Sequence, residues 1–250
     1  MNPLLQLNSV SKAFGGLQVT NDLSFSVFPG EISAIIGPNG AGKTTLFNQI
    51  TGHLLPDSGD ILFNDENLVG KTPQAIVRLG MGRAFQIASI FPEETVLDNV
   101  KAASLSHLEQ TLKFWSPDDS FKEAADEAYA ILESLGLEHQ ASRLAFELSH
   151  GDQKLLDIAI ALALKPTLLL LDEPTAGMSP EERHRTRKMI GDIRKKYNLT
   201  LVFIEHDMDM VFDIAQTVRV LQQGALLAEG PPDEIQQNKE VVRAYLGEEL

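Results

Sequence analysis

Residues Gly37-Pro-Asn-Gly-Ala-Gly-Lys-Thr-Thr45 follow the phosphate-binding loop pattern. The glycines of such a loop let backbone N–H groups curl around an anion without clashes from Cβ atoms. Lys43 would supply a positive charge to the β and γ phosphates, and Thr44 would offer its hydroxyl to Mg²⁺. A continuous apolar strand is expected at Ile32 to Ile36 and a helix from about Lys43. This order of strand, loop and helix predicts an α/β nucleotide-binding core.

The residues around this core predict two further kinds of structure. Short alternating strands are expected from Leu4 to Val27, with tight turns at Gly15-Gly16 and at Pro29-Gly30. Helical spacing dominates between Pro92 and Leu148. It is clearest at Phe121, Ala125, Ala128, Leu132 and Leu135, with Gly136 as the stop. Strand and helix then alternate again, with strands at Thr167 to Leu171 and Leu201 to Ile204, and a helix at Pro180 to Lys196.

The predicted fold class is therefore α/β, with an N-terminal antiparallel β subdomain and an inserted α-helical subdomain. We expect one domain over residues 1–250, in which residues 1–91 hold the β subdomain and the loop part of the core. Residues 92–165 form the helical subdomain, residues 166–230 the rest of the core, and residues 231–250 a helical tail.

A second motif places two carboxylates at the end of a strand. The apolar run Thr167 to Leu171 leads directly into Asp172 and Glu173. A parallel sheet brings ligand-binding groups to the carboxyl ends of its strands. We expect Asp172 to hold a metal, directly or through water, and Glu173 to activate or orient the attacking water. An isolated Asp-Glu pair is more often the solvated end of a strand than a catalytic site. The phosphate loop in the same chain favours the catalytic interpretation instead.

A third motif is Leu148-Ser-His-Gly-Asp-Gln153, which precedes an apolar helix from Leu155 to Leu164. A Ser hydroxyl and a Gly N–H at a helix start form a second anion-binding end, although Ser149 taken alone is more often only a helix cap. The chain thus has one phosphate loop and two helix starts suited to anions.

Composition excludes several other functions. The formal net charge of −14 repels nucleic acid, and no basic stripe offsets it. The absence of cysteine excludes disulfides, thiolate zinc sites and cysteine nucleophiles. Residues 1–10 do not have the pattern of a signal peptide, and the longest apolar run, Ile158 to Leu164, is too short to cross a bilayer. Any membrane role is expected to come through a partner.

Taken together, these motifs resemble those of the ABC-transporter ATPases. In that family a phosphate loop, a glutamine, a Leu-Ser-x-Gly signature, a strand ending in Asp-Glu and a histidine at a strand end occur in this order. All five are present, and the resemblance covers Leu4 to about Gly230. It implies an enzyme that hydrolyses ATP with Mg²⁺, and it carries roles over to particular residues.

Phe14 resembles the aromatic residue that stacks on adenine, although a buried strand aromatic is the alternative. Gln86 resembles the glutamine that reaches Mg²⁺ and the attacking water, while its loop touches the membrane subunit. His206 resembles the histidine that contacts the γ-phosphate. The catalytic set implied is thus Glu173, His206 and Gln86, and the metal set Thr44, Gln86 and Asp172. The nucleotide-binding set is Phe14, Gly37, Pro38, Asn39, Gly40, Ala41, Gly42, Lys43, Thr44, Thr45, Ser149 and Gly151.

The family also implies partners. Ser149 and Gly151 would contact the γ-phosphate held by a second ATPase subunit, in a homodimer or a heterodimer of related chains. The dimer would drive transmembrane permease subunits at the cytoplasmic face of the inner membrane, and indirectly serve a solute-binding protein. Apolar residues around Gln86 would suit a groove for a permease helix, and buried packing explains them equally well; these are Phe85, Ile87, Ile90, Phe91 and Pro92.

The signature departs from the commonest form at His150, where glycine is usual, and at Asp152, where a polar residue is more common. If either side chain faces the incoming phosphate, ATP-driven dimerisation should be weaker.

Finer features resemble the ATPases of branched-chain amino acid importers, among them Phe14-Gly-Gly16, Arg83-Ala-Phe-Gln86 and Ala176-Gly-Met178. Urea, amide and other small-solute systems share such features. The alternatives are a soluble ABC-type ATPase of DNA repair or translation and a GTP-binding switch. The first usually carries a long coiled coil or two cassettes, and the second carries an Asn-Lys-x-Asp motif. None of these is found in the sequence.

Overall fold

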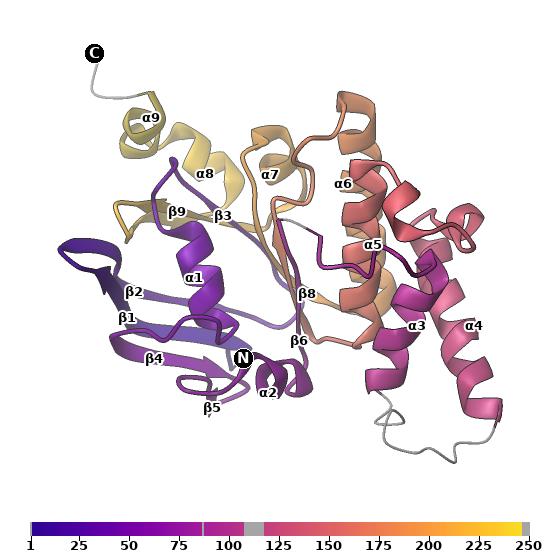
Figure 1. The fold of residues 1–250 in the computed structure, drawn as a ribbon. Coiled ribbons are helices and arrows are strands. Elements are labelled where there is room, and N and C mark those ends of the chain that lie inside the picture. Colours follow the sequence, from indigo (N-terminus) through magenta and orange to yellow (C-terminus); the bar gives the residue numbers. More distant parts are fainter. Residues whose placement is uncertain (1, 87, 108–117, 247–250) are drawn as a thin grey trace. The chain divides into compact units, whose positions relative to one another are not determined.

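A computed structural model describes residues 2–86, 88–107 and 118–246 of the chain. Backbone contacts divide the chain into two compact units. Figure 1 labels the helices and strands of which they consist. Unit 1 comprises Met1–Leu79 and Thr200–Leu250, and unit 2 comprises Gly80–Leu199. The domain and segment boundaries expected from the sequence remain a prediction.

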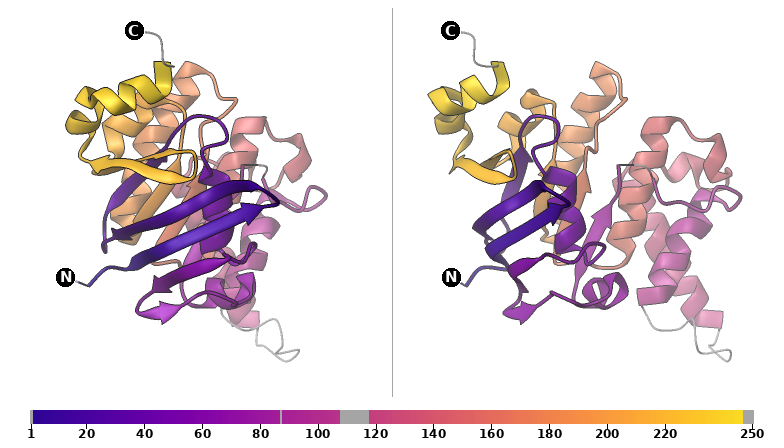
Figure 2. Two further views of the ribbon diagram at one scale, coloured as in Figure 1. Left: turned by 90° about the vertical axis from the view of Figure 1, so that its left-hand side faces the viewer. Right: turned by 60° about the vertical axis from the view of Figure 1, so that its left-hand side comes forward.

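Unit 1 contains an antiparallel sheet in the strand order β2-β1-β4-β5, whose strands lie side by side in Figure 2. A tight turn at Gly15-Gly16 joins β1 to β2, as the sequence predicts. Alternate residues are buried at Leu5 and Leu7 of β1 and at Leu23, Phe25 and Val27 of β2, which accounts for the alternating apolar pattern there. The bounds are β1 Leu5–Phe14, β2 Leu17–Val27, β4 Ser58–Phe63 and β5 Glu66–Asn67.

Unit 1 also contains the strand that carries the phosphate loop. Strand β3 lies between β8 and β9 and is parallel to both, while β10 pairs with β9 in the antiparallel sense. All five residues of β3 are buried, as expected for a central parallel strand. The strands are β3 Ile32–Ile36, β8 Thr200–Ile204, β9 Thr217–Gln222 and β10 Ala225–Gly230. The helices are α1 Lys43–Ile50, α2 Pro73–Arg78, α7 Met208–Ile214, α8 Pro232–Gln237 and α9 Lys239–Leu246, the last two of which follow β10.

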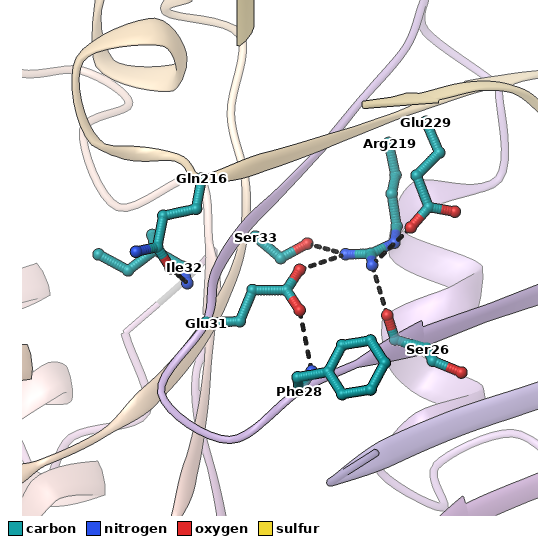
Figure 3. A network of polar contacts seen from close by, with 8 residues as sticks. All are labelled: Ser26, Phe28, Glu31, Ile32, Ser33, Gln216, Arg219 and Glu229. Atoms are coloured by element: carbon teal, nitrogen blue, oxygen red, sulfur yellow. Dashed lines mark hydrogen bonds and ion pairs between the residues drawn. The ribbon is translucent and has the colours of Figure 1, made fainter. Parts of the chain in front are cut away.

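A buried arginine ties β2, β3, β9 and β10 together (Figure 3). The Arg219 guanidinium donates to the Glu229 carboxylate at 2.8 Å, to Glu31 at 3.1 Å, and to the Ser33 hydroxyl. It also donates to the Ser26 carbonyl oxygen. Arg219 is only 1% exposed, so its charge depends on these partners rather than on water. The network therefore fixes the edge of β2 to the strand that precedes the phosphate loop.

Unit 2 pairs β6 with β7 in parallel and packs α5 against both strands. Helices α3 and α4 lie beside α5, so the expected helical segment forms a bundle (Figure 1). The strands are β6 Met81–Ala84 and β7 Leu168–Asp172, and the helices are α3 Val96–His107, α4 Asp118–Ser134, α5 His150–Ala163 and α6 Pro180–Tyr197. Two single 3₁₀ turns, η2 Glu138–Gln140 and η3 Ala145–Glu147, precede α5.

Two details of unit 2 refine the expected elements. Strand β7 begins one residue later than expected, at Leu168. Helix α4 ends at Ser134, and Gly136 follows with a φ of +69°, the left-handed conformation that stops a helix. The Leu137 N–H then donates to the Leu132 carbonyl oxygen at 2.9 Å, as in a Schellman motif. Phe121, at the start of the predicted apolar pattern, is half-exposed rather than buried.

Within the described residues, no helix combines the length and the apolar character needed to span a bilayer.

Candidate functional site

The phosphate-binding loop of unit 1 is shaped by close backbone packing. Gly42, at the start of α1, has a φ of +99°, and a Cβ added there would lie 2.3 Å from the Val19 carbonyl oxygen. A Cβ added at Gly37 would lie 2.2 Å from the Leu221 carbonyl oxygen. Real Cβ atoms do not approach oxygen so closely, so only glycine fits at either position. The loop is thus held against β2 and β9 in the form that leads into α1.

Lys43 places its ammonium group inside this loop. Its Nζ donates to the Gly37 carbonyl oxygen at 2.7 Å and to the Pro38 carbonyl oxygen at 3.1 Å. Asn39, Gly40 and Thr44 are exposed on the outside of the turn. The loop therefore offers a positive charge, the start of α1 and a solvent-accessible hydroxyl within a few residues, which together suit a phosphate chain.

Unit 1 places the other two predicted residues at the ends of strands. Phe14 closes β1 and is 51% exposed, which excludes the buried-aromatic alternative and leaves a ring face available. The Lys12 ammonium lies 5.6 Å from the centre of the Phe14 ring. His206 follows β8 and is exposed, and its backbone N–H donates to the Glu205 carboxylate at 2.9 Å.

Unit 2 holds the predicted acids at the end of β7. Asp172 is buried, and its Oδ2 accepts a hydrogen bond from Arg83 Nη2 at 2.8 Å. Burial raises the pKa of Asp172, while the hydrogen bond and charge of Arg83 oppose this shift. Burial also lowers the pKa of Arg83, which the bond to Asp172 opposes. The two opposite charges therefore stabilise one another in a buried environment.

Glu173 and Gln86 meet although they lie 87 positions apart in sequence. Gln86 Nε2 donates to Glu173 Oε2 at 2.9 Å, so the amide holds one oxygen of the carboxylate. Glu173 has a φ of +51°, an unusual conformation for a residue with a side chain. The backbone therefore turns at this residue so that Asp172 stays buried while Glu173 is half-exposed.

The residues expected to hold Mg²⁺ fit the ion by the chemistry of their atoms. Asp172 Oδ1 is buried without a hydrogen-bond partner among the described residues, an arrangement that a cation or its water would satisfy. Carboxylate, hydroxyl and amide oxygens are the ligands that Mg²⁺ prefers, usually beside several waters and phosphate oxygens. In the described part of the chain no cluster of three or more His, Cys, Asp or Glu forms a complete cage.

The signature segment begins α5. Ser149 is exposed and caps the helix, its Oγ accepting the Asp152 N–H at 3.1 Å, and Gly151 is half-buried. The Asp152 carboxylate accepts a hydrogen bond from Gln140 Nε2 at 3.0 Å, and the His150 ring packs near Gly177. Both unusual side chains thus have contacts within unit 2, and their effect on dimerisation remains a prediction.

The apolar residues around Gln86 are not all buried. Phe91 is 61% exposed and Pro92 is exposed, whereas Phe85 and Ile90 are half-buried. Phe146, also exposed, lies next to this segment because its N–H donates to the Pro92 carbonyl oxygen at 3.1 Å. Ile87 lies outside the described residues. Phe91 and Phe146 therefore form an accessible aromatic surface beside the Gln86 loop.

Three charged residues near the acids were not selected as site residues from the sequence: Arg83, Lys154 and Asp157. Lys154 and Asp157 are buried in α5. Burial raises the pKa of the Asp157 carboxyl to about 6, although hydrogen bonds from Phe85 and Ser89 oppose the shift. The signal available in the sequence was a charge inside the otherwise apolar stretch from Leu155 to Leu164, since buried charges require partners.

Comparison with known proteins places these motifs in context. Residues 20–176 match the model of the ABC transporter family, and residues 225–250 match one described as branched-chain amino acid ATP-binding cassette transporter. The chain is 42% identical to the high-affinity branched-chain amino acid transport ATP-binding protein LivG of Escherichia coli K12, over 98% of each chain. It is 38% identical to the corresponding protein BraF of Pseudomonas aeruginosa, over the same shares.

Solved structures agree. A nucleotide-free ATP-binding cassette from an ABC transporter superposes with a TM-score of 0.86 at 32% identity, covering 99% of this chain and 100% of that one. The ADP conformation of MJ1267, also an ATP-binding cassette of an ABC transporter, gives 0.85 at 32% identity with the same coverage.

Proposed function

The chain belongs to the ABC transporter family of ATP-binding proteins and is an ATPase, and from this premise we propose that it powers uptake of branched-chain amino acids or similar small solutes. The solute is supported by relatives named for branched-chain amino acid transport, and by the match of residues 225–250. The soluble repair or translation alternative is not favoured by these relatives.

ATP is bound first by the phosphate loop of unit 1. The loop N–H groups and the start of α1 hold the phosphates, and the Lys43 ammonium leaves its carbonyl partners to pair with the β and γ phosphates. The exposed ring of Phe14 stacks on adenine, a contact that needs an accessible face. Thr44, Gln86 and Asp172 would hold Mg²⁺, which neutralises charge on the transferred phosphate.

Hydrolysis then depends on Glu173. Its carboxylate orients the attacking water and accepts a proton from it, while Gln86 fixes the carboxylate through the 2.9 Å hydrogen bond. His206 donates to the γ-phosphate from the end of β8. The observation that carries this proposal is the contact between Gln86 and Glu173, because it joins two expected catalytic residues that lie 87 positions apart in the sequence.

A second ATPase subunit completes the site. The exposed Ser149 hydroxyl and the Gly151 N–H, at the start of the fourteen-residue helix α5, contact the γ-phosphate of the ATP held by the partner. ATP thus closes a dimer, of identical or related chains, and hydrolysis reopens it. The permease at the cytoplasmic face of the membrane follows this motion through the aromatic surface of Phe91 and Phe146.

Substitution of Glu173→Gln tests the catalytic part. Steady-state ATP hydrolysis should fall by roughly 10² to 10⁴, the usual size of a general-base effect. Binding of ATP, measured by calorimetry, should be retained. Glu181→Gln, at an exposed acid in the first turn of α6, is the matched control and should hydrolyse ATP as the wild type does. Full turnover by Glu173→Gln would remove this residue from the mechanism.

Substitution of Phe91→Arg tests the permease surface. Co-purification with the permease subunits should be lost, because a charge replaces an exposed aromatic ring, while ATP binding is kept. Phe121→Arg is the control, since Phe121 is also an exposed aromatic side chain of unit 2. Equal loss of the permease from both variants would argue against a specific surface.

A further inference from the structure

Helix α5 carries two buried charges. Lys154 is 4% exposed and Asp157 is 3% exposed, within a helix whose other buried residues are Leu155, Leu156, Ile158, Ala159, Ala161, Leu162 and Ala163. Residues three positions apart lie on the same face of a helix. Burying such groups is unfavourable unless each has well-placed partners, so their contacts indicate what they are for.

Asp157 holds the loop that carries Gln86. Its Oδ2 accepts the Phe85 N–H at 2.6 Å, and its Oδ1 accepts the Ser89 N–H at 3.0 Å. These two backbone groups lie on either side of Gln86 in the chain. A carboxylate is suited to this task because each of its two oxygens can accept one N–H group. The loop is therefore fastened to α5 at both ends, with the Gln86 side chain exposed between them.

Lys154 holds the backbone of Glu173. Its Nζ donates to the Glu173 carbonyl oxygen at 2.6 Å. Glu173 is the residue with the unusual φ of +51°, and such conformations persist where the surroundings fix them. One face of α5 thus contacts the Glu173 backbone and the backbone on either side of Gln86. Glu173 and Gln86 are the two residues that meet in the 2.9 Å hydrogen bond.

We propose that Lys154 and Asp157 are positioning residues that hold Glu173 and the Gln86 loop in register on α5, so that the pair can act on one water molecule. This inference rests on the proposed function of Gln86 and Glu173 in hydrolysis. Ser149 caps the same helix, so the residue proposed to contact the second subunit and the two positioning residues lie on one element.

Kinetics of Asp157→Asn test the proposal. The substitution keeps the shape of the side chain but turns an NH₂ group toward one of the two N–H donors. kcat should fall by about tenfold to a hundredfold, the effect expected of small misplacements of catalytic groups, while KM for ATP changes by less than about twofold. Asp157→Glu, which keeps two acceptor oxygens, should retain more of kcat than Asp157→Asn. Lys154→Met should lower kcat in the same way.

Asp98→Asn is the matched control. Asp98 lies on α3 in the same unit, and its carboxylate bonds with Thr95 and Lys101 rather than with a catalytic loop. This variant should keep the wild-type kcat. Suppose that the wild type hydrolyses ATP and that Glu173→Gln is impaired. An unchanged kcat in both Asp157→Asn and Lys154→Met would then overturn this inference and leave the proposed function standing. A wild type without ATP hydrolysis would instead overturn the proposed function.

Hydrogen exchange of the wild-type protein gives a test that requires no variant to fold. The amides of Phe85 and Ser89 should exchange slowly, because Asp157 accepts both hydrogen bonds. In Asp157→Asn they should exchange faster, while the amides of Leu169 and Leu170 in β7 keep their protection. Wild-type amides at Phe85 and Ser89 that exchange as fast as an unstructured peptide would overturn the proposal.

Discussion

Replacing Arg83 by Met should strongly destabilise the protein, because it leaves Asp172 without its ion-pair partner. The Arg83 and Asp172 side chains are 7% and 1% exposed, and 2.8 Å separates Nη2 from Oδ2. Asp172 Oδ1 already has no hydrogen-bond partner within the described residues. Methionine replaces the apolar stem of arginine but offers neither charge nor donor, so the substitution removes the ion pair and keeps most of the packing around the stem.

The magnitude follows from the burial of the pair. Removal of one partner from a buried ion pair costs about 3 to 5 kcal/mol, since an uncompensated charge remains inside. Domains are stable by only about 5 to 15 kcal/mol, so the loss is a large share of the total. With a slope of about 3 kcal/mol per molar urea, the midpoint of unfolding should fall by about 1 to 1.7 M.

Urea unfolding of Arg83→Met, Asp172→Asn and the double variant provides the assay. The double variant should recover at least half of the loss in the free energy of unfolding, because no buried charge is left without a partner. Without Arg83 the pKa of Asp172 in the folded state rises further above its unfolded value. The free energy of unfolding of Arg83→Met should therefore increase as the pH falls toward the pKa of Asp172 in the unfolded chain. It should decrease as the pH rises. A loss below about 1 kcal/mol, or no recovery in the double variant, would refute this reasoning.

Three other outcomes follow from the structure. Arg219→Met should lower the free energy of unfolding by about 3 to 5 kcal/mol in urea, since it leaves the Glu31 carboxylate largely buried without its cationic partner. Lys195→Met, at an exposed position in the last turn of α6, should change it by less than about 0.5 kcal/mol. The Asp157 pKa of about 6 in the folded protein lies above its value in the unfolded chain, so the folded state binds this proton more tightly. The resulting contribution to the free energy of unfolding is present at low pH and is lost as the pH rises through 6. Unfolding free energies of wild type and Asp157→Asn should therefore differ by about 1.4 kcal/mol more at pH 5 than at pH 7.5, and a constant difference would contradict this. Gly37→Ala should lower the melting temperature and weaken ATP binding, because its Cβ would meet a carbonyl oxygen at 2.2 Å; wild-type values for both would be unexpected.

The elements that carry the motifs could be predicted closely because their signals are local. Strand β3 and the start of α1 fall where the glycine loop places them, and Ser149 caps α5 as its residue type favours. Strand β7 differs by one residue, since a continuous run of leucines does not define its own ends.

The polar contacts between distant segments could not be predicted in this way. Arg83 and Asp172 are 89 positions apart, and the Asp157 and Phe85 pair are 72 apart. Spacing along the chain says nothing about which buried charges will meet. Asp152 illustrates the same limit, because the sequence raised repulsion of an incoming phosphate and the structure pairs its carboxylate with Gln140.

Affinity cleavage with ATP and Fe²⁺ in place of Mg²⁺ tests the central proposal most directly, which is that Thr44, Gln86 and Asp172 hold the metal of one bound nucleotide. When hydrogen peroxide and ascorbate are added, iron bound with ATP generates an oxidant that cuts the backbone only where the chain lies close to the metal. Mass spectrometry then locates the cuts. We expect cuts beside Thr44, Gln86 and Asp172, all of them lost in Lys43→Ala. Cuts confined to the phosphate loop, with none beside Gln86 or Asp172, would contradict the account.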